Sequence, residues 1–378
     1  MIAIAKPYLT ADEAQAAFDV IMSGWVTQGP KVQEFEEKFA SFTDSRYAVA
    51  VSSCTTALHL SFLVSGIKPG DEVICPSMSF IATANSIVYT GAKPVFAEVN
   101  KDFNIDPLHA ESLINSKTKA ILIVHQLGMP ADIDTFKEIC MKHNLLLIED
   151  AACAVGSAYK GKRIGSHSDL VCFSFHPRKV VTTGDGGMVT TSNPEYYKRL
   201  KSLRQHSMTI NDLERHKSGK IMTEEYPEVG YNYRMTDIQA AIGIKQLEKL
   251  DWIIQERRKI ALHYHEALKD LEQIELPVEK EGYYSNYQSY AITLNPELAA
   301  LRDGLMQKML DHGISTRRGV MTAHTEKAYK GRRYHLPVSE LLSESSIMLP
   351  VYVGLTKEQQ DFVIKNLKES LKIKFAQK

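Results

Sequence analysis

The sequence lacks several features that would point directly to a function. Its 378 residues carry 45 basic and 45 acidic side chains, so the formal net charge is zero. A neutral chain has no electrostatic reason to bind nucleic acid or an anionic membrane, and we expect neither as a partner. No apolar run approaches the roughly 20 residues that span a bilayer. The opening stretch, MIAIAKPYLTADEAQAAF, lacks the pattern of a secretory signal.

Cysteine is scarce as well. The five cysteines stand at positions 54, 75, 140, 153 and 172, an odd number with no C-x-x-C spacing. This pattern predicts neither a disulfide framework nor a zinc or other metal site. We therefore expect a reducing, cytoplasmic compartment.

Two common phosphate-binding signatures are also missing. The sequence has no G-x-G-x-x-G after a predicted strand and no G-x-x-x-x-G-K-[ST]. Its glycine cluster, Gly184-Asp185-Gly186-Gly187, precedes a predicted strand, which is the wrong context for either motif. These absences disfavour a dinucleotide-dependent dehydrogenase and a P-loop enzyme.

The first two-thirds of the chain alternates short apolar runs with helical patterns. Hydrophobic residues make up 44% of the chain and charged residues 24%, as in ordinary globular proteins. Such buried strands separated by helices predict a mainly parallel sheet covered on both faces. The predicted strands are 47–53, 71–77, 93–99, 119–125, 145–150, 169–175 and 187–191, with helices that include 55–65 and 132–144.

The pattern changes near a capping box at Thr236 to Gln239, which opens a predicted helix to about Leu250. A second helix is predicted over 252–271, then a strand over 289–294 and helices over 305–312 and from Thr356. We predict an α/β protein with a large domain, 1–250, built on a mainly parallel mixed sheet covered by helices. A smaller α+β domain is predicted over 251–378.

Three features carry candidate chemistry, and the first is the junction between a strand and a helix at Val51 to Leu58. Free backbone N–H groups and the positive end of the helix dipole make such a junction a good phosphate site. The hydroxyls of Thr55 and Thr56 can add hydrogen bonds. The alternative is ordinary N-capping of the helix by Ser or Thr.

The second feature is Glu149-Asp150, at the end of a strongly apolar strand. Ligands of α/β folds bind beyond the carboxyl ends of the strands, and a buried Asp150 needs a positive partner, such as a protonated pyridine nitrogen. Side chains alternate along a strand, so at most one of the two acids faces the site. The alternatives are an exposed strand-end carboxylate or a helix cap.

The third feature is Lys179, just after a predicted strand and before the glycine cluster. A lysine amine in this position can point back over the sheet and form a Schiff base with an aldehyde. Ser174, five residues earlier, can reach a phosphate. The alternative for a lone lysine is a solvated surface charge.

At these three features the sequence resembles the DegT/StrS family of sugar aminotransferases, which are pyridoxal-phosphate (PLP) enzymes with the aspartate aminotransferase fold. The resemblance extends along nearly the whole chain. It includes 29–36 (GPKVQEFE), 52–60 (SSCTTALHL), 69–73 (PGDEV), 76–80 (PSMSF), 149–154 (EDAACA), the Lys179 segment and 230–237 (GYNYRMTD). In this order and spacing, these motifs are highly specific.

The resemblance implies a role for each matching residue. Lys179 matches the lysine that holds the cofactor aldehyde, and Asp150 matches the carboxylate that pairs with the pyridinium nitrogen. Phe80 matches an aromatic residue that stacks on the ring, although an isolated Phe is more often plain core. The residues that match phosphate contacts are Thr55, Thr56, Ser174 and, from the neighbouring subunit, Asn232. The resemblance thus implies a homodimer with shared sites.

One position departs from the family pattern. Cys153 stands where the family often has His or Gln, which can bind the phenolic oxygen of the cofactor. A thiol is a much weaker hydrogen-bonding group. Lys179 itself argues against a related branch that carries histidine there and dehydrates sugars.

The resemblance also implies a reaction. Glutamate would donate the amino group, and a keto-sugar on a nucleotide diphosphate would accept it, most often a 4-keto-6-deoxyhexose for lipopolysaccharide, O-antigen or other glycan precursors. Candidate substrate contacts are Trp25 and Gln28, which could line the sugar pocket, and Arg317, Arg318 and His324, each of which has a surface role as the alternative.

Two alternatives to this reaction remain open. One is a 3-keto-sugar or keto-inositol aminotransferase, or another PLP lyase, on the same fold. The more remote one is a non-catalytic PLP-binding regulatory protein, which would need a broken catalytic set or an added binding domain.

Overall fold

A seven-stranded sheet forms the centre of the protein. The computed structural model describes residues 1–210, 221, 223–330 and 334–372. The strands lie in the order β1-β9-β8-β5-β4-β2-β3, and β9 alone among these seven runs antiparallel to its neighbours. Their bounds are β1 Tyr47–Val51, β2 Glu72–Pro76, β3 Lys93–Ala97, β4 Thr118–Val124, β5 Leu146–Asp150, β8 Leu170–Ser174 and β9 Gly187–Thr191. The predicted mainly parallel sheet is confirmed.

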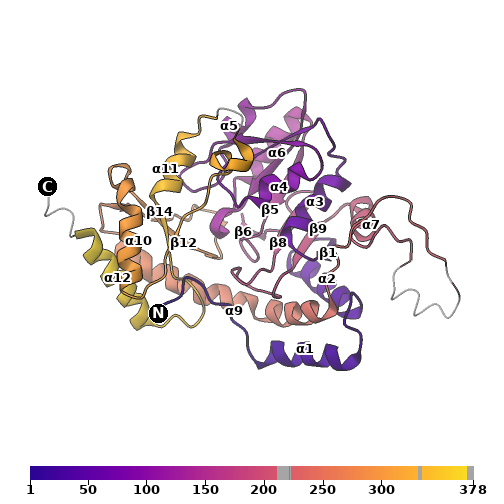
Figure 1. Cartoon of the computed structure of the whole chain (residues 1–378), viewed down its shortest axis with the longest axis horizontal. Helices are drawn as coiled ribbons and strands as arrows, with labels where there is room; N and C mark the ends of the chain where they lie inside the picture. Colours follow the sequence, from indigo (N-terminus) through magenta and orange to yellow (C-terminus); the bar gives the residue numbers. More distant parts are fainter. Residues whose placement is uncertain (211–220, 222, 331–333, 373–378) are drawn as a thin grey trace.

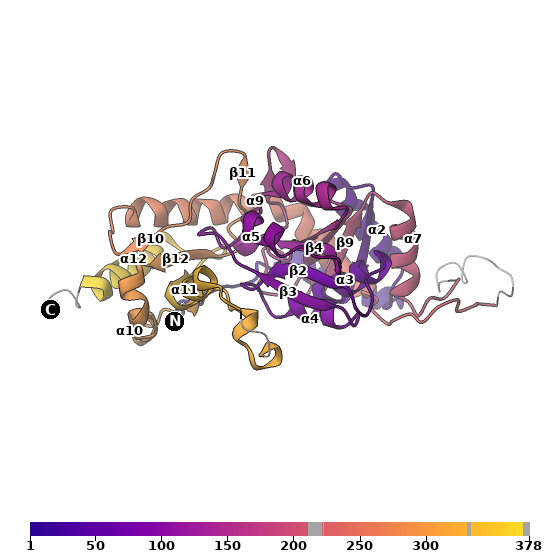
Figure 2. The same ribbon diagram turned by 90° about the horizontal axis from the view of Figure 1, so that it is seen from above.

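Helices cover both faces of this sheet (Figures 1 and 2). On one face α2 (Pro30–Phe42), α6 (Ile133–His143) and α9 (Asp237–Leu268) bury side chains such as Phe39 and Phe136. On the other face α3 (Cys54–Val64), α4 (Ala82–Val88) and α7 (Pro194–Leu203) bury Leu60, Phe62 and Leu200. Strand residues alternate between the two cores, as the period of two of a β-strand requires.

The large sheet packs on the first half of α9, and a second, antiparallel sheet packs on its second half (Figure 1). The order of the second sheet is β10-β12-β14-β13, and it packs on α9 together with α10 and α12. The remaining elements are α1 Ala11–Ser23, α5 Pro107–Ser112, β6 Ala158–Tyr159, β7 Lys162–Arg163, β10 Ile274–Glu275, β11 Tyr283–Tyr284, β12 Tyr290–Leu294, α10 Arg302–Asp311, β13 Arg317–Arg318, α11 Pro337–Ser345, β14 Ser346–Leu349 and α12 Lys357–Lys372.

The long helix α9 corrects one prediction. Two helices were expected, one ending near Leu250 and one starting at Trp252, but a single helix runs from Asp237 to Leu268. No Gly or Pro interrupts it there, and Leu250 and Ile253 are both buried, so the apolar stripe continues through the expected break. The domain boundary at residue 250 falls inside α9 and stays a prediction, and Ile2 packs in the core of the second sheet.

Asp237 links two motifs that lie far apart in the sequence. Its carboxylate accepts hydrogen bonds from the backbone N–H groups of Gly29 (2.8 Å), Lys31 (3.0 Å) and Val32 (2.9 Å), at the start of α2. These are the N–H groups that a helix leaves unpaired at its first turn. The Gly29-Pro30 motif and the Thr236-Asp237 motif therefore form one structural unit.

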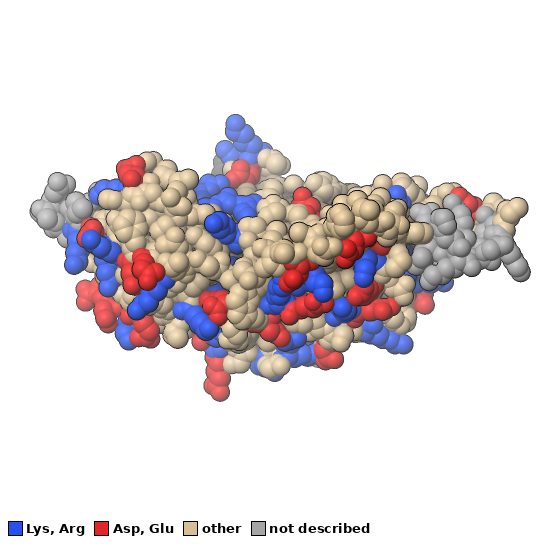
Figure 3. Space-filling model, turned by 90° about the horizontal axis from the view of Figure 1, so that it is seen from below, with Lys and Arg blue, Asp and Glu red and all other residues tan. Residues whose placement is uncertain are grey.

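The surface mixes charges of both signs. On the face in Figure 3, Lys and Arg alternate with Asp and Glu around an uncharged ridge. Among the described residues, no helix is both long and apolar enough to cross a membrane.

Candidate active site

The carboxyl ends of β5 and β8 meet the amino end of α3 near the middle of the large sheet (Figure 1). Asp150 ends β5, Ser174 ends β8, and Ser53 caps α3. The Cys54 thiol, at the start of α3, lies 3.9 Å from Oδ1 of Asp150. The three features predicted from the sequence therefore lie together at the carboxyl ends of central strands, where α/β folds bind ligands.

Asp150 is a buried carboxylate, 5% exposed, so the alternative of an exposed strand-end acid is wrong. Its Oδ2 accepts a hydrogen bond from the Thr83 hydroxyl (2.9 Å) and its Oδ1 from the Ala152 N–H (3.1 Å). Burial raises the pKa of Asp150, and the two hydrogen bonds and the Lys179 charge offset this only partly. A positive group beside Asp150 would remove the cost of burying this anion.

Glu149 points the other way, as the alternation along β5 predicts. Its Oε2 lies 2.8 Å from Nε2 of His125. Nδ1 of His125 accepts the Ala131 N–H (3.0 Å), so Nε2 carries the proton that is donated to Glu149. The two acids therefore differ in role: Glu149 is structural, and Asp150 faces the predicted site.

Thr83 is a site residue that the sequence analysis missed. It lies on α4, and its hydroxyl bonds both Asp150 and the hydroxyl of Ser79 (2.7 Å). The available signal was weak: Thr83 follows the PSMSF motif by one helical turn. Its contact with Asp150 joins residues 67 positions apart, and no local pattern records that contact.

Lys179 lies in the loop after β8, and its amine contacts Cys153. The Nζ to Sγ distance is 3.3 Å. Burial alone would lower the pKa of Lys179, but the neighbouring sulfur atoms of Cys153 and Cys54 and the Asp150 carboxylate raise it. The lysine is half-buried beside the site, which argues against a solvated surface charge.

The start of α3 provides a cradle for an anion. Ser53 accepts the Thr56 N–H (3.2 Å), while the Thr56 hydroxyl donates to the Ser53 carbonyl (2.8 Å), so the capping alternative holds for that hydroxyl. Within the described part of the chain, the Cys54 and Thr55 N–H groups have no protein acceptor. A Cβ on Gly187 would lie 2.4 Å from the Ser53 carbonyl carbon, so only glycine fits there.

Phe80 and Asn232 are both exposed. Phe80 is 64% exposed in the loop before α4, so the alternative of a plain core residue is wrong. Asn232 forms an isolated bridge with Gln205. Both side chains are free to meet a ligand or a second subunit, and their predicted roles stay predictions.

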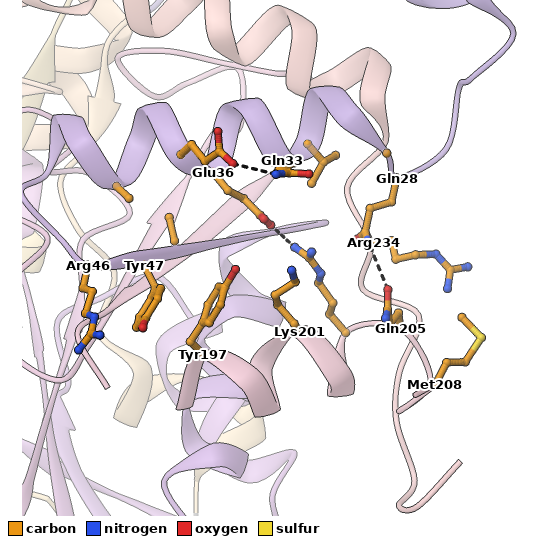
Figure 4. Close-up of a pocket in the computed structure, with 16 residues that line it drawn as sticks. Gln28, Gln33, Glu36, Arg46, Tyr47, Tyr197, Lys201, Gln205, Met208 and Arg234 are labelled. Atoms are coloured by element: carbon orange, nitrogen blue, oxygen red, sulfur yellow. Dashed lines mark hydrogen bonds and ion pairs between the residues drawn. The ribbon is translucent and has the colours of Figure 1, made fainter. Parts of the chain in front are cut away.

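Trp25 and Gln28 both have hydrogen-bond partners within the chain. The Trp25 indole N–H donates to the Gln28 carbonyl (3.3 Å), and the Gln28 amide donates to Oε1 of Gln205 (3.0 Å; Figure 4). Gln28 also lines a cavity of about 340 Å³ between α2, β1 and α7. Of the residues predicted for the site, the described lining of this cavity includes Gln28 alone. It is therefore separate from the Lys179 and Asp150 site.

Arg318 and His324 lie in different surroundings. Arg317 and Arg318 are exposed on β13, where they can meet solvent or an anion. His324 is buried: Nδ1 contacts the Ser77 hydroxyl (2.5 Å) and Nε2 lies 3.0 Å from Glu340. A substrate contact by His324 would require it to exchange one of these partners.

The residues present fit the cofactor that the resemblance implies. PLP carries a phosphate, an aldehyde and a basic ring nitrogen, and the site offers a helix amino end, a lysine amine and a buried carboxylate that lacks a full positive partner. The described residues contain no His, Cys, Asp and Glu cluster that could hold a metal ion, and all five cysteines are free.

Comparisons with known proteins support the same conclusion. A sequence profile of the DegT/DnrJ/EryC1/StrS aminotransferase family matches residues 7–368. The chain is similar to the aminotransferase TlmJ from Streptoalloteichus hindustanus, with 32% identity, 98% and 99% of the two chains covered and a TM-score of 0.91. It is similar to Helicobacter pylori PseC, an aminotransferase of pseudoaminic acid biosynthesis, at 29% identity, 98% coverage of each chain and a TM-score of 0.92. It is also similar to a Streptococcus pneumoniae protein named as a sugar aminotransferase, in its PLP form, at 29% identity, 98% coverage of each chain and a TM-score of 0.91.

Proposed function

Because the chain belongs to the DegT/DnrJ/EryC1/StrS aminotransferase family, which uses PLP, we propose that it transfers an amino group from glutamate to a nucleotide-linked keto-sugar. The observation that carries the proposal is that Lys179, Asp150 and the amino end of α3 meet at the carboxyl ends of the central strands β5 and β8. We expect this transfer in the cytoplasm.

Bound PLP supplies an aldehyde that condenses with amines and a protonated ring that takes up the electron pair released from a C–H bond. Lys179 is proposed to hold the aldehyde at rest. Once the amino donor replaces it there, its free amine takes the α-proton of the donor. In the second half-reaction Lys179 returns a proton to the acceptor, so one side chain acts as base and then as acid.

Asp150 is proposed to keep the ring nitrogen protonated. In the protein alone, burial raises the pKa of Asp150. A protonated ring nitrogen beside the carboxylate would be stabilised by its negative charge, and would lower the Asp150 pKa toward its ordinary value. Thr83 and the Ala152 N–H fix the two carboxylate oxygens, so the anion stays aimed at one point. Cys153 is proposed to lie near the phenolic oxygen.

The other cofactor residues bind and cover the ring. Thr55 and Ser174 are proposed to hold the phosphate, and Phe80 to stack on the ring face. Thr56 joins them only if it exchanges one of its bonds with Ser53 for the phosphate. Asn232 is proposed to add a phosphate contact in the site of the partner subunit, which makes the homodimer necessary for a complete site.

The proposed acceptor is a 4-keto-6-deoxyhexose on UDP, GDP or dTDP, for a lipopolysaccharide or other glycan precursor. The name of PseC, which links it to pseudoaminic acid, supports a sugar acceptor. Trp25 and Gln28 are proposed to line the sugar pocket. Arg318 and His324 are proposed near the diphosphate or the sugar hydroxyls.

A coupled assay tests this proposal. Purified enzyme with PLP and glutamate is offered a panel of 4-keto and 3-keto nucleotide sugars and a keto-inositol, and release of 2-oxoglutarate is measured. We expect turnover with at least one 4-keto-6-deoxy nucleotide sugar and none with Lys179→Ala. Turnover of the keto-inositol or of 3-keto sugars alone would replace the proposed substrate, and no turnover with any acceptor would contradict the proposal.

A further inference from the structure

A buried ion pair lies behind the proposed phosphate cradle. Glu36 on α2 and Arg204, just after α7, form an ion pair in which the side chains are 7% and 3% exposed. Both also bind the backbone of Ala50 in β1: the Ala50 N–H donates to Glu36 (2.9 Å), and the Ala50 carbonyl accepts from Arg204 (2.6 Å). β1 is an edge strand of the large sheet, so the pair satisfies groups that no neighbouring strand would reach.

Stability alone is a weak reason for such a pair. Removing two charges from water is costly, and apolar replacements of similar volume are often neutral or stabilising. The pair, however, supplies one acceptor and one donor to a single residue of an edge strand. An apolar pair could fill the space but could not fix the Ala50 backbone.

Ala50 lies directly upstream of the proposed phosphate cradle. Val51 ends β1, and Ser52 and Ser53 lead into α3. Ser52 is held in turn by its N–H, which donates to the Tyr233 carbonyl (2.8 Å). The position of the cradle therefore depends on Ala50 on one side and on Tyr233 on the other.

Arg204 also holds the segment that carries Asn232. Its own carbonyl accepts the Tyr233 N–H (2.9 Å), and the Leu203 carbonyl accepts the Tyr231 N–H (2.7 Å). The approach is so close that a Cβ on Gly230 would lie 2.2 Å from the Ser207 nitrogen. Arg204 thus binds β1 through its side chain and the Asn232 segment through its main chain.

We propose that Glu36 and Arg204 form a positioning pair for cofactor binding, an inference that rests on the proposed function. The pair holds two segments at a fixed separation. One is the Ser52 to Thr56 cradle of its own site, and the other carries Asn232, which contacts the phosphate in the site of the partner subunit. Neither charge touches the cofactor. Loss of the pair should weaken PLP binding in both sites of a dimer and leave the proton transfer at Lys179 unchanged.

The test compares PLP affinity with fold stability in four variants. Arg204→Met and Glu36→Gln remove the pair, and Arg204→Lys keeps the charge but not the guanidinium, whose Nη1 donates to both Glu36 and Ala50. The double variant Glu36→Met with Arg204→Met replaces both charges. Arg199→Met is the matched control, because Arg199 lies on α7 and forms an exposed pair with Glu228. The measurements are absorbance titration of the apo-proteins with PLP, thermal unfolding, and the rate of the glutamate half-reaction at saturating PLP.

We expect at least a tenfold rise in the PLP dissociation constant for Arg204→Met, Glu36→Gln, Arg204→Lys and the double variant, with none for Arg199→Met. The double variant should regain thermal stability relative to Arg204→Met but not PLP affinity. At saturating PLP, the half-reaction should stay within about threefold of wild type.

Wild-type PLP affinity in the double variant would overturn the positioning role and leave only a structural one. A half-reaction that stays slow at saturating PLP would also overturn it, because the pair would then act on the chemistry. Failure of the proposed function would appear differently, as wild-type protein that binds no PLP or does not react with glutamate.

Discussion

At the scale of single residues, the site depends on how a buried carboxylate is stabilised. Asp150 has a raised pKa because burial outweighs the hydrogen bonds from Thr83 and Ala152. In the protein alone, the folded state holds the Asp150 proton more tightly than the unfolded state does. The free energy of unfolding therefore falls as pH rises from about 3.8 through the raised pKa. Bound PLP should remove this loss.

Asp150→Asn should lower the turnover number at least a hundredfold while the fold is retained. The amide cannot supply the negative charge that keeps the ring nitrogen protonated, and each pKa unit corresponds to about 1.4 kcal/mol. Steady-state kinetics with glutamate and circular dichroism measure the two effects. Near-normal turnover would mean that another acid holds the ring nitrogen.

Thr83→Val should lower kcat/KM about tenfold. A hydrogen bond to a charged group contributes about 1.5–3 kcal/mol, and valine replaces the hydroxyl with a methyl group of similar size. Thr83→Ser is the matched control, because it keeps the donor, and it should stay within about twofold of wild type. Equal losses in the two variants would mean that packing of the Thr83 methyl group, not its hydroxyl, matters.

At the scale of elements, α1 is held on α9 by one buried acid. Glu13 accepts hydrogen bonds from Gln246 (2.9 Å), the Thr10 N–H (2.7 Å) and Lys249 (3.0 Å). Burial would raise the pKa of Glu13, but these bonds outweigh it and lower the pKa from 4.5 to about 2. The ionised carboxylate therefore stabilises the fold above pH 4.5, and this contribution is lost as pH falls toward 2.

Each pKa unit corresponds to about 1.4 kcal/mol, so ionised Glu13 contributes about 3 kcal/mol to the free energy of unfolding above pH 4.5. Urea unfolding at pH 6 and pH 3.5 should show a smaller pH effect in Glu13→Gln than in wild type. Asp12→Asn is the control, because Asp12 contacts the same Lys249 but is 63% exposed. Identical pH dependence in wild type and Glu13→Gln would contradict this account of the α1 junction.

The sequence predicts the elements of the large sheet well, because most of its strands contain a short apolar run that is buried on both faces. All seven predicted strands are present, and their ends shift by two residues at most. The sequence could not predict the contacts between elements. The Thr83 bond to Asp150, the Asp237 cap on α2 and the Glu36 to Arg204 pair each join residues far apart in the chain. The two-residue strands of the smaller sheets are too short to leave a periodic pattern.

At the scale of the whole molecule, exposed apolar side chains bear on assembly. The exposed face of α1 carries Phe18, Ile21 and Met22, which are 55%, 54% and 68% exposed and share one helix face. Phe80 adds an exposed aromatic side chain beside the proposed site. Exposed apolar side chains of this size are consistent with the proposed homodimer.

Mixed dimers test whether the sites are shared. Lys179→Ala and Asn232→Ala subunits, dissociated and reassociated together, should form heterodimers in which one composite site is wholly wild type. Activity should then exceed that of either parent. The control mixes Lys179→Ala with Asp150→Asn; both residues are proposed to serve the site of their own subunit, so no activity should return. No recovery in proven Lys179 and Asn232 heterodimers would place Asn232 outside the partner's site.

If PLP is bound through Lys179, reductive trapping will label that lysine. Borohydride converts a C=N bond between lysine and PLP into a stable amine, and peptide mapping by mass spectrometry then locates the modified lysine. We predict one modified peptide, labelled at Lys179, and no label when glutamate has first converted the cofactor to its amine form. A label at another lysine, or none in protein titrated with PLP, would contradict the account.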